Sequence, residues 1–236
     1  MKSASIKKIL ILVTILAVPG FLYYLLQEKG KNRYKPLPII GPKVVGSTFH
    51  SVRGKDIPDT IYHKVKDLNF VNQSSDTVNW DTYKNKILVV NVFYTRGNTF
   101  GIKITNKAMQ AFYATFGHNK GINFASFTID PVHDQPAVLK KYGDSLAAIP
   151  GRWDLLTGDS TKVFAFLNEQ LFIDAHQAMG RDGHNRYSYS NAFVLVDPQH
   201  RLRGYYEASS QEALSKLDDE IKVLIAEVLR NTEDGR

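Results

Sequence analysis

The feature that most constrains the fold is a strand, a loop and a helix that follow one another in the middle of the chain. Residues 87–95 (ILVVNVFYT) are mostly apolar and rich in β-branched side chains, which predicts a buried strand. A tight loop with two glycines, residues 96–101 (RGNTFG), comes next. Residues 103–116 then place an apolar residue at every fourth position from Ile104, which predicts a helix. This succession is typical of a layered α/β domain.

Strands and helices alternate through the rest of the chain, which ends in a hairpin and a helix. Strands are predicted at residues 69–73, 77–80, 123–129, 153–156, 190–197 and 202–207, and helices at 135–146, 160–170 and 212–229. Asp159 or Ser160 is the predicted cap of the helix over 160–170. This order predicts an α/β fold in which helices flank a mixed central sheet.

An uncharged run, residues 9–26, follows a basic N-terminus, residues 1–8. As a helix this run would span about 27 Å, close to the thickness of the hydrocarbon core of a bilayer. We predict a single transmembrane anchor, with a cleaved signal peptide as the alternative. Basic residues flank both ends of the run, so the charges do not determine its orientation.

Prolines and glycines recur through residues 27–58, which predicts an irregular stalk after the anchor. A globular domain is expected over residues 59–230, followed by a short tail, residues 231–236.

The composition excludes several classes of function. The chain has no cysteine, so disulfides, thiolate metal sites and thiol redox catalysis are impossible. The net charge of +7 is scattered rather than gathered in a basic strip with aromatics, which argues against nucleic-acid binding. Basic residues beside the uncharged run would each gain about 1 kcal/mol near anionic lipid. No P-loop, dinucleotide or Gly-x-Ser-x-Gly pattern occurs, and we expect no enzyme activity.

Five sequence blocks, in order, resemble the Sco/SenC family of membrane-anchored copper chaperones of cytochrome c oxidase assembly. The blocks are the central loop with its frame residues Phe93, Thr95, Lys103 and Thr105, then FTIDP at 127–131, PGRW with LLTGD at 150–159, FVLVDP at 193–198 and LRGYY at 202–206. The resemblance covers roughly residues 59–229. It implies a thioredoxin-like domain on one anchor in the bacterial inner membrane, with the domain in the periplasm.

The resemblance also implies where copper would bind, and the ligands are missing. Family members use two loop cysteines and a histidine just before the late strand. Here Gly97 and Gly101 stand at the cysteine positions, and Tyr189 stands at the histidine position. Thiolates are soft ligands suited to Cu(I), whereas glycine offers no donor and a neutral phenol is a poor one. We therefore carry over no copper site and expect no cofactor.

A polar insertion, residues 174–186, precedes Tyr189 and could hold substitute metal ligands. It contains His176, Asp182 and His184, but the spacing of the two histidines is not a recognised metal-binding pattern. We favour solvated loop histidines and keep a metal site built from His176 and His184 as the alternative. Asp130 and Asp134 are interpreted as caps of the following helix rather than as a carboxylate pair.

The loop itself has two interpretations. The glycines can be the remains of a lost site, or they can leave a concavity at a helix N-terminus beside Arg96 that holds an anion or a partner's carboxylate. Arg96, Phe100 and Tyr189 are the candidate binding residues, and Tyr94 and Tyr187 are expected to line the vacated site. The sequence thus predicts a non-catalytic binding or assembly module on the membrane. Its expected protein partner is the respiratory oxidase or an assembly factor.

Overall fold

The computed structural model describes residues 2–29, 36–52, 54–97, 100–180 and 185–233. The chain forms two compact units, Met1–Lys35 and Pro36–Arg236. The first unit holds helix α1 (Lys2–Lys29), which includes the uncharged run and Pro19. None of the helices among the described residues combines the length and the apolar character needed to cross a membrane.

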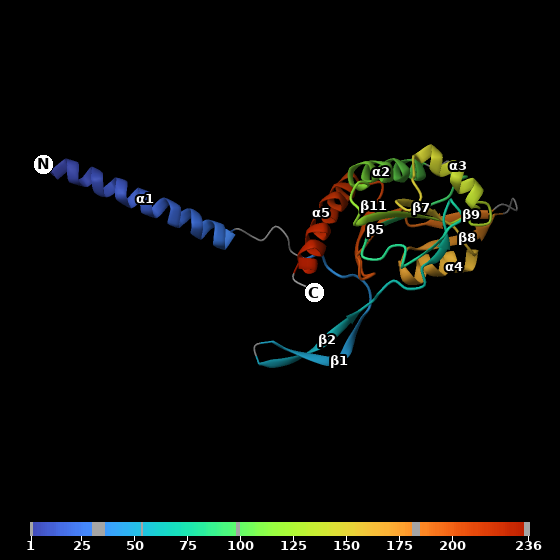
Figure 1. Cartoon of the computed structure of the whole chain (residues 1–236), viewed down its shortest axis with the longest axis horizontal. Helices are drawn as coiled ribbons and strands as arrows, with labels where there is room; N and C mark the ends of the chain where they lie inside the picture. Colours follow the sequence, from blue (N-terminus) through green and yellow to red (C-terminus); the bar gives the residue numbers. More distant parts are fainter. Residues whose placement is uncertain (1, 30–35, 53, 98–99, 181–184, 234–236) are drawn as a thin grey trace. The chain divides into compact units, whose positions relative to one another are not determined.

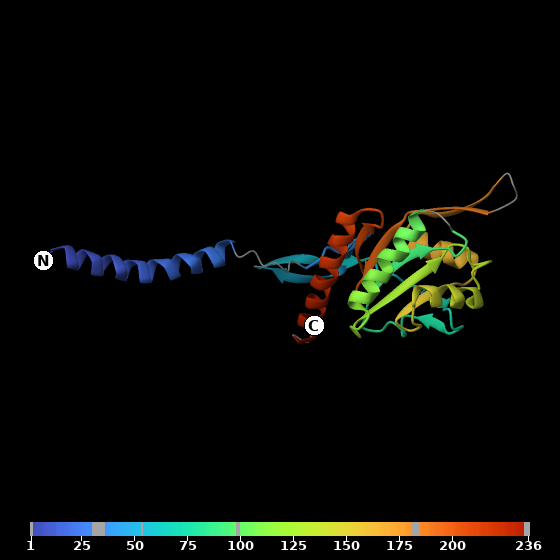
Figure 2. The same ribbon diagram turned by 90° about the horizontal axis from the view of Figure 1, so that it is seen from above.

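The second unit is built on a five-stranded sheet in the order β11-β10-β5-β6-β7 (Figures 1 and 2). Its strands are β5 (Ile87–Phe93), β6 (Ile122–Thr128), β7 (Trp153–Leu156), β10 (Ala192–Val196) and β11 (Leu202–Glu207). The strands β5, β6 and β7 run parallel, and β10 runs antiparallel to both β5 and β11. The mixed sheet predicted from the sequence is therefore confirmed.

Helices follow the strands where the periodicity predicts them. They are α2 (Phe100–Phe116), α3 (Pro136–Leu146), α4 (Ser160–Ala165) with a π-helical turn η1 (Phe166–Gln170), and α5 (Gln211–Glu233). The Asp159 carboxylate accepts a hydrogen bond from the Lys162 amide at 3.1 Å, which confirms the cap. Helix α2 begins at Phe100 rather than Lys103, so Gly101 lies in its first turn. Ile104 and Ala108, expected on its buried face, instead line a groove of about 520 Å³ beside α5.

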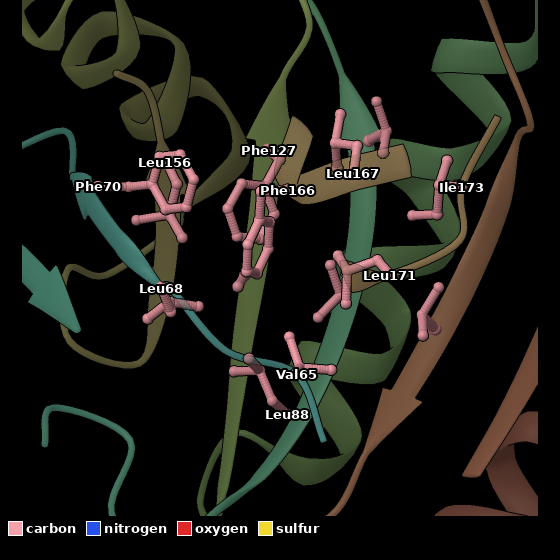
Figure 3. Packing of buried hydrophobic residues seen from close by; sticks show 14 of the residues in the cluster. Val65, Leu68, Phe70, Leu88, Phe127, Leu156, Phe166, Leu167, Leu171 and Ile173 are labelled. Atoms are coloured by element: carbon pink, nitrogen blue, oxygen red, sulfur yellow. The ribbon is translucent and has the colours of Figure 1, made fainter. Parts of the chain in front are cut away.

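The sheet has an apolar core on each face, because side chains alternate along its central strand. On β5, Leu88 and Val90 join one cluster, while Ile87 and Val89 join the other. Figure 3 shows the first cluster, in which Phe127 of β6 packs against Phe166 of η1, with ring centroids 5.0 Å apart. The loop after β5 is thus mounted on a strand with every residue buried.

The structure corrects the prediction of an irregular segment over residues 27–58. Strands β1 (Lys43–Val52) and β2 (Lys55–Tyr62) pair antiparallel there. Three of the prolines and glycines that suggested a stalk are compatible with this two-stranded sheet: Pro58 lies in a strand with an unpaired edge, Gly46 lies in a bulge and Gly54 forms the turn with a φ of 76°. A second small hairpin, β3 (Asn69–Val71) with β4 (Thr77–Asn79), is where the sequence predicts it.

The insertion at residues 174–186 is also more ordered than its polar sequence suggests. Strands β8 (Ala175–Met179) and β9 (Asn185–Tyr189) form an antiparallel hairpin whose paired residues include Ala175 with Tyr189 and His176 with Ser188. Strand β8 is exposed beyond Ala175, so it lacks the apolar alternation that identifies a half-buried strand, and in β9 the partly buried Tyr187 and Tyr189 alternate with exposed residues over only five positions.

A buried arginine ties the start of the second unit to its last strand and its last helix. The Arg203 side chain is 1% exposed and donates through Nη1 to Asp197 at 2.9 Å and through Nη2 to Glu227 at 2.8 Å. The same guanidinium donates to the carbonyl oxygens of Leu37, at 2.7 Å, and Pro38, at 3.2 Å. The guanidinium thus donates to four residues. Because two of them are Leu37 and Pro38, the segment that begins the second unit is held against β11 and α5.

Candidate functional site

The loop after β5 is held by a buried carboxylate on the segment after β6. Arg96 donates through Nε and Nη2 to Asp130 Oδ2, at 2.9 and 2.5 Å. Asp130 is 1% exposed, and its other oxygen accepts the Tyr187 hydroxyl at 2.7 Å. One carboxylate therefore joins the loop to the β8–β9 hairpin. Two of the Arg96 donor groups are directed inward, although 56% of its side chain stays exposed.

Asp134 forms a second buried junction and does not cap α3, contrary to the prediction. It is fully buried, and it accepts from the Thr95 amide at 3.0 Å and from the Thr128 hydroxyl at 2.5 Å. The Thr95 hydroxyl and His133 Nδ1 are both within hydrogen-bonding distance of its other oxygen, Oδ1. Gln135 takes the N-cap position of α3, and its side chain makes no capping hydrogen bond. Asp134 therefore fastens the ends of β5 and β6 together.

The space at the first former cysteine position is filled by other side chains. A Cβ placed on Gly97 would lie 1.9 Å from Ile102 Cδ1 and 2.9 Å from the Tyr94 ring. Ile102 is 2% exposed, so it is packed into the place where a ligand side chain would start. A Cβ on Gly101 would meet only the Asn191 amide nitrogen, at 3.3 Å.

Two further tyrosines, Tyr94 and Tyr187, lie near Tyr189, which stands at the histidine position that the resemblance implies. The Tyr94 ring lies 5.3 Å from the Tyr187 ring and 6.5 Å from the Tyr189 ring, the latter edge-on. Burial raises the pKa of Tyr189 to about 12, and burial together with the hydrogen bond to Asp130 does the same for the pKa of Tyr187. Both phenols are therefore neutral at physiological pH, and a neutral phenol is a poor ligand for copper.

The residues present do not fit a Sco-type copper site. Gly97 and Gly101 offer no side-chain donor, and Tyr189 offers only a neutral phenol. Within the described ranges, Asp130, His133 and Asp134 bring three potential ligand atoms within 4.8 Å of one another. Their carboxylates already accept bonds from Arg96 and from neighbouring threonines, so they act as structural junctions of the loop.

His176 does not point toward the tyrosines. It pairs with Ser188, whereas Tyr187 and Tyr189 alternate with Ser188 along β9, so His176 and the tyrosines occupy opposite faces of the hairpin. Its side chain is 67% exposed and meets Asp174 at 2.5 Å. His184 and Asp182, the other members of the predicted set, lie outside the described residues.

Phe100 is the most exposed large apolar residue among those described, at 81%. It is the first residue of α2, directly after the loop. Arg96 and Phe100 thus leave solvent-accessible surface at the loop, whereas Tyr189 is half-buried. An exposed aromatic at a loop that no longer carries ligands is a candidate protein contact.

A mixed sheet in this order, with a loop between a buried parallel strand and a helix, defines a thioredoxin-like domain. The family model for SCO1/SenC matches residues 59–224, and the chain belongs to this family. The SCO1 protein homolog of Bacillus subtilis (strain 168) is 22% identical over 171 residues, which cover 72% of this chain and 86% of the relative.

Solved structures of the family share the fold. The chain is similar to a SCO1/SenC family lipoprotein from Bacillus anthracis str. Ames, with a TM-score of 0.60 and 20% identity, covering 69% of this chain and 95% of that one. It is also similar to BsSco, a member of the Sco family of cytochrome c oxidase assembly proteins with a disulfide switch. That match has a TM-score of 0.56 and 20% identity, covering 69% and 93% of the two chains.

Proposed function

We propose that this chain is a non-catalytic binding or assembly module of the copper-handling Sco family that has given up the metal itself. The observation that carries the proposal is the combination of a retained loop frame with a filled ligand position. Gly97 is closed off by Ile102 and Tyr94, while Arg96 remains fastened to Asp130. A surface that is kept rigid without its chemistry is suited to recognition.

We propose that the partner belongs to the respiratory oxidase or to its assembly machinery, in keeping with the family. BsSco is named as an assembly protein of cytochrome c oxidase, which supports this direction. The contact surface is the exposed side of the loop, where Phe100 and the outer part of Arg96 are accessible.

We also propose that α1 anchors the chain in the bacterial inner membrane and that the second unit lies in the periplasm. The Bacillus anthracis relative is described as a lipoprotein, whereas this sequence has no cysteine to carry a lipid. The uncharged run within α1 is the segment of the chain with the composition for this role.

Copper titration tests the loss of the carrier role. We expect the full chain in detergent to bind neither Cu(I) nor Cu(II) stoichiometrically at micromolar concentrations, because thiolates are absent and the phenols are neutral. Competition with a chromophoric chelator gives the stoichiometry. Micromolar or tighter binding that is lost in His176→Ala or His184→Ala would establish the relocated metal site instead.

Photo-crosslinking tests the binding role. A photoreactive amino acid at position 100 is expected to crosslink an oxidase subunit or assembly factor in native membranes, identified by mass spectrometry. The same probe at Thr115, exposed further along α2, is the matched control and should give no such product. Equal products from both positions would contradict a specific contact at the loop.

A further inference from the structure

We infer that the β1–β2 hairpin is a lipid-binding arm that rests on an anionic membrane surface. The inference rests on the proposed anchoring of the chain through α1. The family match begins at residue 59, so all of β1 and half of β2 lie outside it. In the part of the chain that the structure describes, these two strands pair only with one another (Figure 1).

The arm has a fixed base and an uncovered length. At the base, Ile40 donates to the Leu202 carbonyl and Val65 donates to the His200 carbonyl, both at 2.8 Å. These bonds attach both ends of the hairpin to β11 and to the turn before it. Beyond the base, five large apolar residues are exposed by 43–74% of their surface: Val44, Val45, Phe49, Ile57 and Ile61. A two-stranded hairpin with uncovered apolar side chains is marginal in water and calls for a covering surface.

The strand edges are poor templates for a partner strand. Pro58 removes an amide donor from β2, and β1 changes register between Val45 and Phe49. The bulge is held by Asp59, whose carboxylate contacts His50 Nδ1 at 2.6 Å. Because both edges are interrupted, the faces of the arm rather than its edges are the binding surface.

The two faces differ in where their ionisable groups lie. Pairing places Asp59 and His50 on the face that carries Val44, Ile57 and Ile61. The opposite face carries Val45 and Phe49, which pair with Thr60 and Pro58, so its middle holds no ionisable group, while the exposed Asp56, paired with Ser51, lies on this face near the turn. At its base Lys43 lies over the Tyr62 ring, 5.5 Å from the centroid. An apolar centre with a Tyr–Lys pair at one end suits the boundary between headgroups and acyl chains.

The length of the segment between α1 and β1 and the charge around the arm favour lipid over a second copy of the chain as the binding partner. Only residues 30–42 separate α1 from β1, a reach of at most about 45 Å when fully extended. The sequence of this tether is basic at positions 31, 33 and 35, and the exposed Lys64 and Lys66 follow the arm. This excess of positive charge complements anionic headgroups and opposes association with a second copy of the same basic chain.

The experiment uses the full chain in nanodiscs of phosphatidylglycerol and phosphatidylcholine, one chain per disc. Because the chain has no cysteine, Ser51→Cys gives a single labelling site on the face with Phe49, and Ser145→Cys on α3 is the control site. With spin-labelled lipids, we expect fluorescence of the label at 51 to be quenched at least threefold more than at 145. Val45→Ser with Phe49→Ser should abolish the difference, while Val44→Ser with Ile61→Ser, from the other face, should leave most of it.

Each alternative has its own signature. A chain that co-elutes with the discs but shows equal quenching at 51 and 145 would overturn the arm and leave the anchor standing. A chain that does not enter the discs would overturn the anchor, and the arm inference with it. Shielding of position 51 only in discs with two chains, or only after native membrane proteins are added, would assign the arm to a second copy or to a protein and overturn the lipid assignment.

Discussion

Arg203→Met is expected to lower the free energy of unfolding by about 3 kcal/mol, near the lower end of the range for breaking a buried ion pair. The substitution leaves Asp197 fully buried and strips Glu227 and the carbonyls of Leu37 and Pro38 of a donor. The loss is expected at the lower end because Arg201 still donates to Asp197 at 2.7 Å. Denaturant unfolding followed by tryptophan fluorescence measures it, since Trp80 and Trp153 both lie in the second unit.

Two further variants separate the network from a general effect of lost charge. Arg203→Lys keeps the charge, but a single ammonium cannot serve four acceptor residues in different directions, so an intermediate loss is expected. Lys216→Met removes an exposed ammonium that lies 3.8 Å from the half-buried Glu220 and should change little. If Arg203→Met were as mild as Lys216→Met, the entry of the chain into the domain would not depend on this arginine.

The sequence predicts elements whose signal is local. The buried strand and the helix after it follow from periodicity, and the Asp159 cap follows from its position before a helix. The hairpins β1–β2 and β8–β9 were missed because β1, β2 and β8 are largely exposed and lack a buried, alternating face, and because the alternation in β9 covers only five residues. In the sequence, Pro58 therefore argues against a strand, although proline is tolerated in a strand whose outer edge is unpaired.

The sequence indicates which residues lie at the candidate site but not the contacts that hold them. The resemblance locates Gly97, Gly101 and Tyr189, and Arg96 with Phe100 follows from the loop sequence. The bonds of Asp130 to Arg96 and Tyr187 span 34 and 57 residues, and a helix-capping pattern explains the same aspartates locally. Only tertiary structure shows that their partners come from the loop and the hairpin. The filling of Gly97 by Ile102 is likewise invisible in a sequence, because it depends on a side-chain direction.

Gly97→Ala is expected to destabilise the second unit by about 1–3 kcal/mol, the usual cost of overpacking a filled position. The added methyl would stand 1.9 Å from Ile102 Cδ1, so Ile102 has to leave its rotamer, and the Tyr94 ring at 2.9 Å blocks part of the movement. Gly101→Ala is the matched control at the other former cysteine position. It lies in the first turn of α2, where alanine is favoured over glycine by roughly 0.5–1 kcal/mol, and it meets only Asn191 at 3.3 Å.

The two substitutions should therefore move stability in opposite directions, or leave Gly101→Ala near neutral, in the same unfolding assay. Their difference bears on function, because a copper site needs a side chain at both positions. A costly Gly97→Ala means that the pocket has been rebuilt around Ile102 and Tyr94, so regaining the ligands alone would not restore a carrier. A Gly97→Ala protein as stable as the parent would show instead that the Ile102 side chain moves aside at little cost in free energy. The loop would then be a metal site that lacks only its ligands, and a rebuilt recognition surface would lose its structural basis.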